Sequence, residues 1–249
     1  MTQAQEAAYE CGVVPGEHDA RFVKQHLAAY AFARPLVQDK RYLEIGFGEG
    51  YGLYYLSEVT KDATGIDLAP GNIPRAQAKY QRPYLRFVHM PGTELQFPDA
   101  SFDVAGSFQV IEHIPEPQLI AHLTEVRRVL TTNGLYCLST LNLEHNMKPG
   151  RSYQKLEFHE KEFTAPELRS LLEEVFPQVE LYGLYLTKTH QAYQRLKRWG
   201  LNKWGPAHLN PVAQYFEHMT EHDFRARRSV SKQALDLIAI CRKTPRQEA

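Results

Sequence analysis

The chain has 249 residues, which is enough to bury a full α/β core as one large domain or two small ones. Its 29 basic and 29 acidic residues cancel, so the overall charge does not indicate a nucleic-acid partner. Three cysteines that lie far apart argue against a disulfide framework or a zinc site. With neither a leader segment nor an apolar run of bilayer length, the sequence predicts a cytoplasmic protein that does not span a membrane.

The first periodic stretch is residues 19–34, which follow a lead-in without a clear period. Asp19 is a typical helix-starting residue, and Pro35 is expected to end the helix. We expect residues 1–35 to form a helical arm or lid, in which Tyr30 helps to close a cofactor pocket. His26 and Tyr30 are four residues apart and share a helix face, so half-buried packing is the alternative. The face with the helical period consists of Phe22, Val23, His26, Leu27, Tyr30 and Ala31.

Residues 42–45 form a short apolar run that breaks into glycines at every second position. Gly46, Gly48 and Gly50 predict a strand, a tight turn and the start of a helix, because glycine allows positive φ and lets a ligand lie close to the backbone. Tyr51 stands where the dinucleotide fingerprint needs its third glycine, and the Gly-Lys-Ser/Thr sequence of the P-loop is missing. A turn that binds no ligand is the alternative interpretation.

The stretch at residues 64–68 predicts a second strand that ends near an acid. Asp67 follows Glu44 by the interval of one β-α-β unit, and in nucleotide-binding folds an acid here accepts hydrogen bonds from both ribose hydroxyls. The alternative is that Asp67 caps the helix that begins near Asn72. Further patterns predict a helix over residues 72–80 and strands over 85–89 and 104–108.

Residues 42–117 resemble the class I S-adenosylmethionine-dependent methyltransferases, in particular the methyltransferase type 11 and ubiquinone-biosynthesis-like group. At two positions the sequence departs from the family, because Pro91 replaces the acid that faces the adenine and Gln109 replaces another acid. The motifs that carry the resemblance are Glu44-x-Gly46-x-Gly48-x-Gly50, Ser101-Phe-Asp103 and Ser107-Phe-Gln-Val-Ile-Glu-His-Ile-Pro115.

The resemblance implies S-adenosyl-L-methionine as the cofactor and S-adenosyl-L-homocysteine as its product. In such enzymes the methionine end lies at the glycine turn and the ribose lies at the acid after the second strand. The adenine lies between the tips of the second and third strands. The residues that we expect around the cofactor are Tyr30, Glu44, Gly46, Gly48, Gly50, Asp67, Leu68, Gly92, Thr93 and Gln109.

The second half of the chain continues the alternation of helices and strands. Asn133-Gly134 should stop a helix over residues 117–130, and the capping box of Thr164 and Glu167 should start another. Apolar runs predict strands over 135–142, 179–186 and 234–242. The resemblance implies a single α/β domain over residues 1–249 with a Rossmann-like, seven-stranded, mostly parallel sheet flanked by helices. The implied strand order is 3-2-1-4-5-7-6, with the last strand antiparallel.

Residues 187–233 form a long insertion between the last two predicted strands, and long insertions are usually functional. No Asp or Glu occurs from Leu181 to Phe216, a stretch that holds five basic residues and both tryptophans, Trp199 and Trp204. We expect a helical cap that binds an anionic or sugar-like acceptor, with arginine binding phosphate and tryptophan stacking on a ring. A solvated basic helix face is the alternative.

The resemblance implies an enzyme that transfers a methyl group, and we expect the acceptor to be a hydroxyl of a small molecule, sugar-like or a secondary metabolite. His113 is the first candidate for the general base, because an imidazole with a pKa of about 6.5 suits removal of a hydroxyl proton. His159 is a weaker candidate. The alternative is that His113 caps a helix or positions a loop. No cluster of ligands in the sequence suggests a metal ion.

Other functions remain open. They are a quinone-pathway C- or O-methyltransferase, a non-catalytic protein that binds S-adenosylmethionine and, disfavoured by Tyr51, a dehydrogenase. The signature of enzymes that methylate amino groups of nucleic-acid bases, Asn-Pro-Pro-Tyr, is missing at residues 107–110, which argues against a nucleic-acid substrate. The sequence leaves the oligomeric state open.

Overall fold

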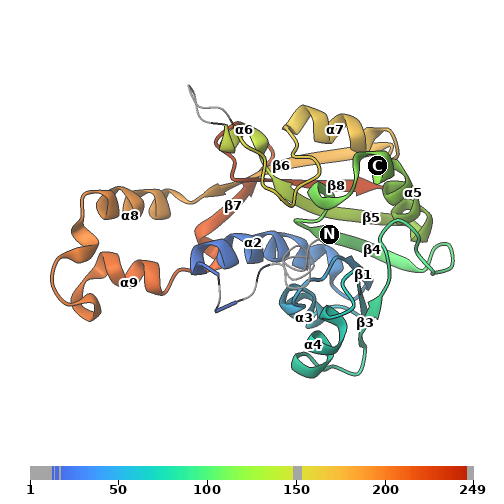
Figure 1. Cartoon of the computed structure of the whole chain (residues 1–249), viewed down its shortest axis with the longest axis horizontal. Helices are drawn as coiled ribbons and strands as arrows, with labels where there is room; N and C mark the ends of the chain where they lie inside the picture. Colours follow the sequence, from blue (N-terminus) through green and yellow to red (C-terminus); the bar gives the residue numbers. More distant parts are fainter. Residues whose placement is uncertain (1–12, 14, 17, 148–152, 246–249) are drawn as a thin grey trace.

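The computed structural model describes residues 13, 15, 16, 18–147 and 153–245. In this part of the chain, eight strands form one sheet in the order β3-β2-β1-β4-β5-β8-β6-β7 (Figure 1). Strands β1 to β5 pair in parallel, whereas β8 is antiparallel to both β5 and β6. The strands are β1 Arg41–Ile45, β2 Asp62–Asp67, β3 Leu85–His89, β4 Phe102–Phe108, β5 Leu130–Leu141, β6 Gln178–Leu186, β7 Phe224–Arg227 and β8 Asp236–Arg242.

The predicted fold class and strand order are confirmed, with β8 taking the place of the predicted seventh strand. The difference is the edge strand β7, which belongs to the predicted insertion and pairs antiparallel with β6. β1 lies between β2 and β4, so the strand order reverses next to the glycine turn. In open α/β sheets, ligands bind in the crevice at such a reversal.

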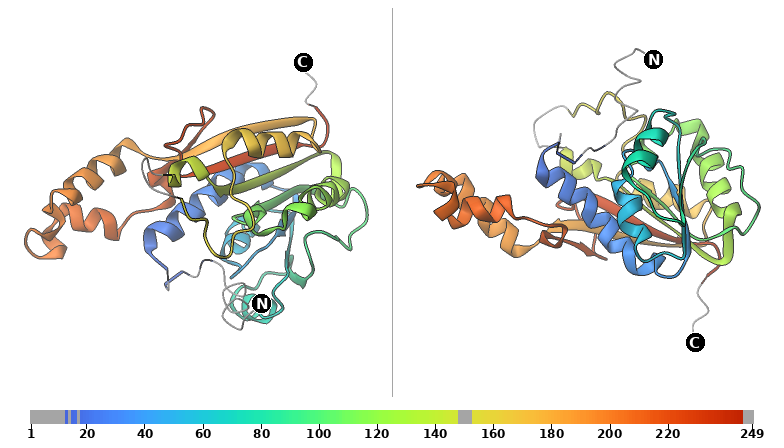
Figure 2. Two further views of the ribbon diagram at one scale, coloured as in Figure 1. Left: turned by 45° about the horizontal axis from the view of Figure 1, so that its top comes forward. Right: turned by 90° about the horizontal axis from the view of Figure 1, so that it is seen from below.

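Helices cover both faces of the sheet, and each face has its own apolar core (Figures 1 and 2). Buried residues of α2, α3 and α4 belong to one core, and those of α5 and α7 belong to the other. The part of the predicted arm at residues 1–12 lies outside the described residues. The helices that cover the sheet are α2 Ala20–Val37, α3 Tyr51–Ser57, α4 Asn72–Lys79, α5 Leu119–Val129 and α7 Ala165–Glu173.

Two predicted helix-stop signals are wrong, although the helix predicted to end at residue 130 does end at Val129. Helix α2 continues past Pro35 to Val37, and the fully buried Val37 packs in the core, so packing outweighs the lost N–H of proline in the last turn. The second error is at Asn133-Gly134, which lies inside β5 because the chain passes directly from α5 into that strand at Leu130. Leu130 is fully buried and pairs with Phe102, so burial starts the strand earlier than the local Asn-Gly pattern predicts.

The insertion forms a helical hairpin that projects from one end of the sheet in every view (Figures 1 and 2). Its two helices, α8 Lys188–Arg198 and α9 Pro211–Glu217, are joined by two short turns of 3₁₀ helix, and β7 then returns to the sheet. Among the described residues, none of the helices combines the length and the apolar character that a bilayer crossing requires.

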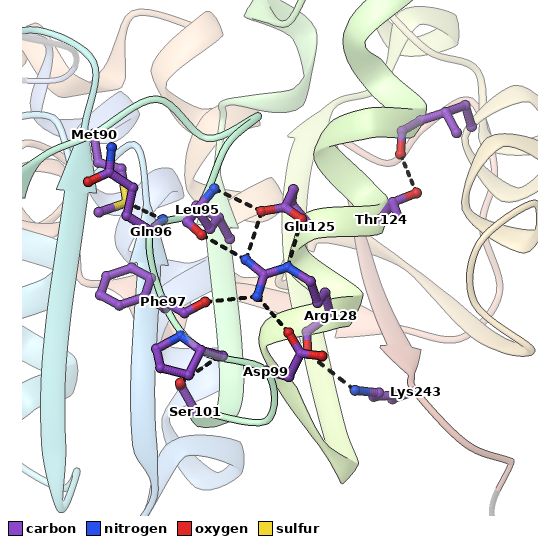
Figure 3. Close-up of polar contacts among 12 residues, drawn as sticks. Met90, Leu95, Gln96, Phe97, Asp99, Ser101, Thr124, Glu125, Arg128 and Lys243 are labelled. Atoms are coloured by element: carbon purple, nitrogen blue, oxygen red, sulfur yellow. Dashed lines mark hydrogen bonds and ion pairs between the residues drawn. The ribbon is translucent and has the colours of Figure 1, made fainter.

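Arg128 on α5 anchors the segment that follows β3 (Figure 3). Its Nη2 donates to the Leu95 carbonyl at 2.7 Å and its Nη1 donates to the Phe97 carbonyl at 2.8 Å. Glu125 Oε1 accepts from Arg128 Nε at 2.8 Å, while Glu125 Oε2 accepts from the Leu95 amide at 2.9 Å. Because a guanidinium is rigid and planar, these bonds fix the middle of the connection between β3 and β4, at Leu95 and Phe97, against α5.

Candidate active site

The glycine turn after β1 has the backbone conformation that the sequence predicts. Gly46, Gly48 and Gly50 have φ values of 71°, 57° and 95°, in the left-handed region that favours glycine. At Gly46 a Cβ atom would lie 2.7 Å from Val110 Cγ2, so a side chain there would also clash. Gly50 precedes α3, and the turn therefore presents the start of that helix to the edge of the sheet.

Asp67 lies at the end of β2 and joins this strand to the glycine turn. Its Oδ2 accepts from the Gly48 amide at 2.8 Å, and its Oδ1 accepts from the Ala69 amide at 2.9 Å. Burial raises the pKa of Asp67, while these two N–H groups oppose the shift. Gly71 is the residue before α4, so the alternative that Asp67 caps this helix is wrong.

Glu44 is fully buried behind the turn, between two tyrosines. Its Oε1 accepts from the Tyr30 hydroxyl at 2.8 Å, and its Oε2 accepts from the Tyr42 hydroxyl at 3.3 Å. Burial raises the pKa of Glu44 to about 8, and the two hydroxyl donors limit this rise. Because Tyr30 comes from α2, this hydrogen bond ties the N-terminal helix to the first strand. The ring of Tyr30 also packs against Gly52, where a Cβ atom would lie 2.0 Å from its Cζ.

A second link between α2 and the turn involves Tyr51, the residue that breaks the dinucleotide fingerprint. Its hydroxyl contacts Nδ1 of His26, whose Nε2 lies 3.3 Å from the carbonyl of Phe108. Burial lowers the pKa of His26 to about 4, so the ring is neutral at physiological pH. His26 and Tyr30 are therefore packed side chains that position α2 over the glycine turn, and Tyr30 also faces the cavity described next.

A cavity of about 950 Å³ lies between the glycine turn, α2, the end of β4 and the base of the helical hairpin. It holds several of the predicted site residues: Tyr30, Gly46, Gly48, Gln109, His113 and His159 line it. The hairpin contributes Gln194, Lys197 and Phe216, whereas Trp199 and Trp204 do not line the cavity.

The other predicted cofactor residues lie outside this cavity. Glu44 lies beneath Tyr30, Gly50 precedes α3, Asp67 is the last residue of β2, and the exposed Leu68 follows it. Gly92 and Thr93 follow β3, and the Gly92 carbonyl lies 2.8 Å from Nδ1 of the buried His122. The carboxyl ends of β1 and β2 are thus adjacent to the cavity, with the segment after β3 farther along the same edge of the sheet.

Two histidines meet at the wall of the cavity, although 46 positions separate them in the sequence. The rings of His113 and His159 are nearly perpendicular, with centroids 4.9 Å apart. His113 Nδ1 lies 2.9 Å from the Phe158 carbonyl, and His159 Nδ1 lies 2.6 Å from Glu162 Oε1. Burial lowers the pKa of His113, which keeps this ring neutral near pH 7.

Glu112 was not predicted as a site residue, yet it lies beside the two histidines. It is fully buried, and its Oε2 accepts from Thr140 Oγ1 at 2.9 Å. Burial raises the pKa of Glu112 to about 8. One ligand atom each from Glu112, His113 and His159 lies within 4.8 Å of the other two. The sequence shows no ligand cluster because the third member comes from a separate loop. The local signals were the Glu-His pair at 112–113 and the His-x-x-Glu pattern at 159–162.

Comparison with known proteins agrees with this geometry. Residues 43–138 match the family model described as a methyltransferase domain. A relative from Mycolicibacterium smegmatis, described as "Probable S-adenosylmethionine-dependent methyltransferase", is 33% identical over 67% of this chain and 63% of its own length. A ubiquinone biosynthesis O-methyltransferase from Azorhizobium caulinodans is 34% identical over 50% of this chain and 45% of its own length. The chain thus spans less than two thirds of these curated relatives.

Solved structures support the same fold. The crystal structure of an S-adenosylmethionine-dependent methyltransferase from Thermotoga maritima, described as a possible histamine N-methyltransferase, is similar with a TM-score of 0.62. The similarity covers 89% of this chain and 90% of that one, at 17% identity, and therefore concerns the fold. The sheet order, the left-handed glycine turn and the matched domain together lead to one assignment. Residues 43–138 thus form a class I methyltransferase domain, the kind of domain whose cofactor is S-adenosylmethionine.

Proposed function

We propose that this protein transfers the methyl group of S-adenosylmethionine to a hydroxyl of a small, polar acceptor such as a sugar-like molecule or a secondary metabolite. The observation that carries the proposal is the continuous cavity from Gly46 and Gly48 to His113 and His159. It brings the expected position of the methyl donor and two histidine side chains into one cavity.

We assign the methionine end of the cofactor to the glycine turn, beneath Tyr30, and the ribose to Asp67. A carboxylate offers about four lone-pair sites, so the two amides that Asp67 accepts from leave room for two ribose hydroxyls. The adenine would lie against Leu68, whose exposed side chain can cover it, and near the backbone of Gly92 and Thr93. Gln109 has a φ of 57° at the end of β4 and would border the methionine end.

The reacting group of the cofactor is already activated. The sulfonium is a good leaving group, so the protein has to align the acceptor oxygen in line with the S–CH₃ bond and exclude water. The Phe158 carbonyl can only accept, so His113 carries its proton on Nδ1 and has its lone pair on Nε2. A neutral imidazole of this kind can take the hydroxyl proton as the C–O bond forms.

Turnover with a panel of hydroxylated acceptors tests the proposal. His113→Asn keeps a donor for the Phe158 carbonyl but removes the base, so kcat should fall about 10²- to 10⁴-fold with little change in S-adenosylhomocysteine binding. His222→Asn, at an exposed position outside the cavity, is the matched control and should retain activity. Undiminished kcat in His113→Asn would exclude His113 as the base. Cofactor binding without turnover on any acceptor would favour a non-catalytic binding protein.

A second candidate function is methylation of an apolar acceptor held in a membrane, of the kind that a quinone-pathway enzyme uses. The hairpin favours it: Trp199, Trp204 and Leu209 are 75%, 78% and 72% exposed, within a stretch that has five basic residues and no acid. Exposed tryptophan beside lysine and arginine is typical of surfaces that bind at the interface of anionic membranes. Lys197 and Phe216 of the same hairpin line the cavity, so the insertion at residues 187–233 would both border the acceptor and contact the bilayer.

Vesicle cosedimentation separates the two candidates. The second predicts binding to vesicles that contain anionic lipid, weaker binding at high salt, and loss of binding in the double variant Trp199→Ser, Trp204→Ser. Ile120→Ser, an exposed apolar position on α5, is the control and should leave vesicle binding unchanged. Equal sedimentation with and without anionic vesicles would exclude the membrane-bound acceptor.

A further inference from the structure

We propose that Glu112, His113 and His159 bind a divalent transition-metal cation of the zinc type at the acceptor end of the cavity. One ligand atom from each residue lies within 4.8 Å of the other two, and all three residues line the cavity. Bonds of about 2.0–2.2 Å to a common ion would draw these atoms closer together, which small side-chain rotations can accomplish.

The tautomers of both histidines suit metal binding. His159 lies with Nδ1 2.6 Å from Glu162 Oε1, and His113 lies with Nδ1 2.9 Å from the Phe158 carbonyl. A carboxylate and a carbonyl both accept, so each ring carries its proton on Nδ1 and its lone pair on Nε2. Histidines that bind metals almost always donate their other N–H to such an acceptor, which fixes the ring and raises its basicity.

The carboxylate beyond His159 is itself held in place. Glu162 is largely buried, and it accepts from the Tyr153 hydroxyl and from the Leu156 amide. These donors hold the Glu162 carboxyl group in the position from which it contacts the His159 ring. Glu162 therefore contacts Nδ1 of His159, and Nε2 on the other side of the ring would bind the ion. Zinc enzymes use the same order of carboxylate, histidine and metal.

Glu112 supplies an independent indication of a ligand. Its side chain is fully buried, and Oε1 has no hydrogen-bond partner among the described residues, although Oε2 is bonded to Thr140. A buried polar atom without a partner is costly and uncommon, and an unmodelled ion is one of its recognised causes. A cation between Glu112 and the histidines would supply the partner that Oε1 lacks.

The backbone also holds the two ligand-bearing segments together. The amides of Glu160 and Lys161, next to His159, donate to the main-chain carbonyl of Glu112 at 2.7 Å and 3.1 Å. The distance between the Glu112-His113 pair and His159 is thereby set by main-chain hydrogen bonds. Ligands fixed in this way need little reorganisation to receive an ion.

The donor set indicates the class of cation. Two imidazoles and one carboxylate are the set of several catalytic zinc sites, whereas Mg²⁺ and Ca²⁺ prefer oxygen ligands alone. Three protein ligands leave a coordination position for the acceptor hydroxyl. With the cation bound, His113 Nε2 would be a ligand and would not act as the base of the proposed metal-free reaction. A hydroxyl bound to the cation would be a stronger acid, so its proton would pass to water while the oxygen attacks the methyl carbon and the C–S electron pair goes to sulfur. This catalytic consequence rests on the proposed methyl transfer, but cation binding does not.

Cobalt(II) and zinc(II) titrations of the full chain, after removal of bound metal with a chelator, test the site. We expect one Co²⁺ per chain with visible absorption bands, displacement by Zn²⁺, and at least tenfold weaker binding in Glu112→Gln and His159→Gln. Glu162→Gln, which alters the residue behind His159 but none of the three ligands, should weaken binding about 10- to 100-fold. His222→Asn, an exposed histidine outside the cavity, is the control and should bind Co²⁺ as the unchanged protein does.

Circular dichroism and S-adenosylhomocysteine binding establish that each variant is folded. Absence of saturable Co²⁺ binding, or equal affinity in the folded His159→Gln and unchanged proteins, would overturn the proposal. The methyl-transfer assay is read separately. Tight Co²⁺ binding without turnover on any acceptor supports the site while contradicting the proposed function, and turnover that persists unchanged in chelator overturns the catalytic consequence of the cation.

Discussion

Replacing Glu44 with glutamine should remove part of the pH dependence of the free energy of unfolding. Glu44 is fully buried between Tyr30 and Tyr42, and its pKa is about 8 in the folded chain against an ordinary value of 4.5. The folded state therefore holds a proton that the unfolded chain releases above pH 4.5. For a carboxyl whose pKa rises on folding, the contribution to stability is complete at low pH and is lost as the pH rises toward 8.

The size of the effect follows from the two pKa values. They differ by about 3.5, and each pKa unit corresponds to about 1.4 kcal/mol, so Glu44 should cost about 5 kcal/mol of unfolding free energy above pH 8 relative to pH 4. At pH 7 the cost should be about 3 kcal/mol. Glutamine carries no charge, keeps an acceptor for the Tyr30 hydroxyl and has nearly the same volume, so Glu44→Gln should escape this cost.

Urea unfolding of the unchanged protein and of Glu44→Gln at pH 5, 7 and 9 measures the effect. The contributions of the other titrating groups are the same in both proteins, so they cancel in the difference between the two unfolding free energies. The variant should gain stability relative to the unchanged protein by several kcal/mol, about 3 or more, between pH 5 and pH 9. Glu94→Gln, at an exposed position, is the control and should show no such trend. A difference between Glu44→Gln and the unchanged protein that stays constant with pH would refute the assignment of a buried, protonated Glu44.

Three further predictions address the support of the site. Gly52→Ala brings a methyl group to 2.0 Å from Tyr30 Cζ, so it should lower stability by about 1–3 kcal/mol and weaken S-adenosylhomocysteine binding; an unchanged melting temperature would contradict this packing. Arg128→Lys loses the planar fork that binds two backbone carbonyls, which should cost about 1.5–3 kcal/mol in urea unfolding; a cost below about 0.5 kcal/mol would contradict the anchoring role. Burial lowers the pKa of His122 to about 4, so its contribution to stability is lost as the pH falls from 6.5 toward 4. His122→Asn should therefore destabilise the protein less at pH 4.5 than at pH 7, and the opposite order would contradict the neutral, buried ring.

Much of the fold could be predicted because its determinants are local. The strand predicted over residues 85–89 is β3 in the structure, and Thr164 and Glu167 form the expected capping box at the start of α7. The order of the sheet follows once the chain resembles a known family. The short strand β7 was missed because its four residues have no apolar pattern, and its pairing with β6 depends on the return of the hairpin.

The errors come from positions where tertiary packing outweighs local signals. Pro35 lies in the last turn of α2, where one lost hydrogen bond is offset by the burial of Val37. Gly134 lies in β5 where the register with β4 shifts, between Leu130 and Leu135, which both pair with β4, so Asn-Gly marks an irregularity within the strand and does not stop a helix. Neither interaction is visible in a short window of sequence.

In the candidate site, too, the residues placed by local patterns could be predicted, and those placed by a distant loop or by the insertion could not. The turn with Gly46 and the acid at Asp67 follow from the local pattern of one β-α-β unit, whose strands β1 and β2 pair in parallel, so the sequence predicts both. His159 is brought to Glu112 and His113 by main-chain bonds from a distant loop. Trp199 and Trp204 were expected to stack on an acceptor, but they are exposed and do not line the cavity. Such placements depend on how a loop or insertion folds back, which local sequence patterns do not specify.

Calorimetric titration with S-adenosylhomocysteine tests the central claim most directly. We predict saturable heat with one site per chain and at least tenfold weaker binding in Asp67→Ala, while NADH gives no heat under the same conditions. A titration without heat at millimolar S-adenosylhomocysteine and S-adenosylmethionine, on protein that is folded by circular dichroism, would contradict the account.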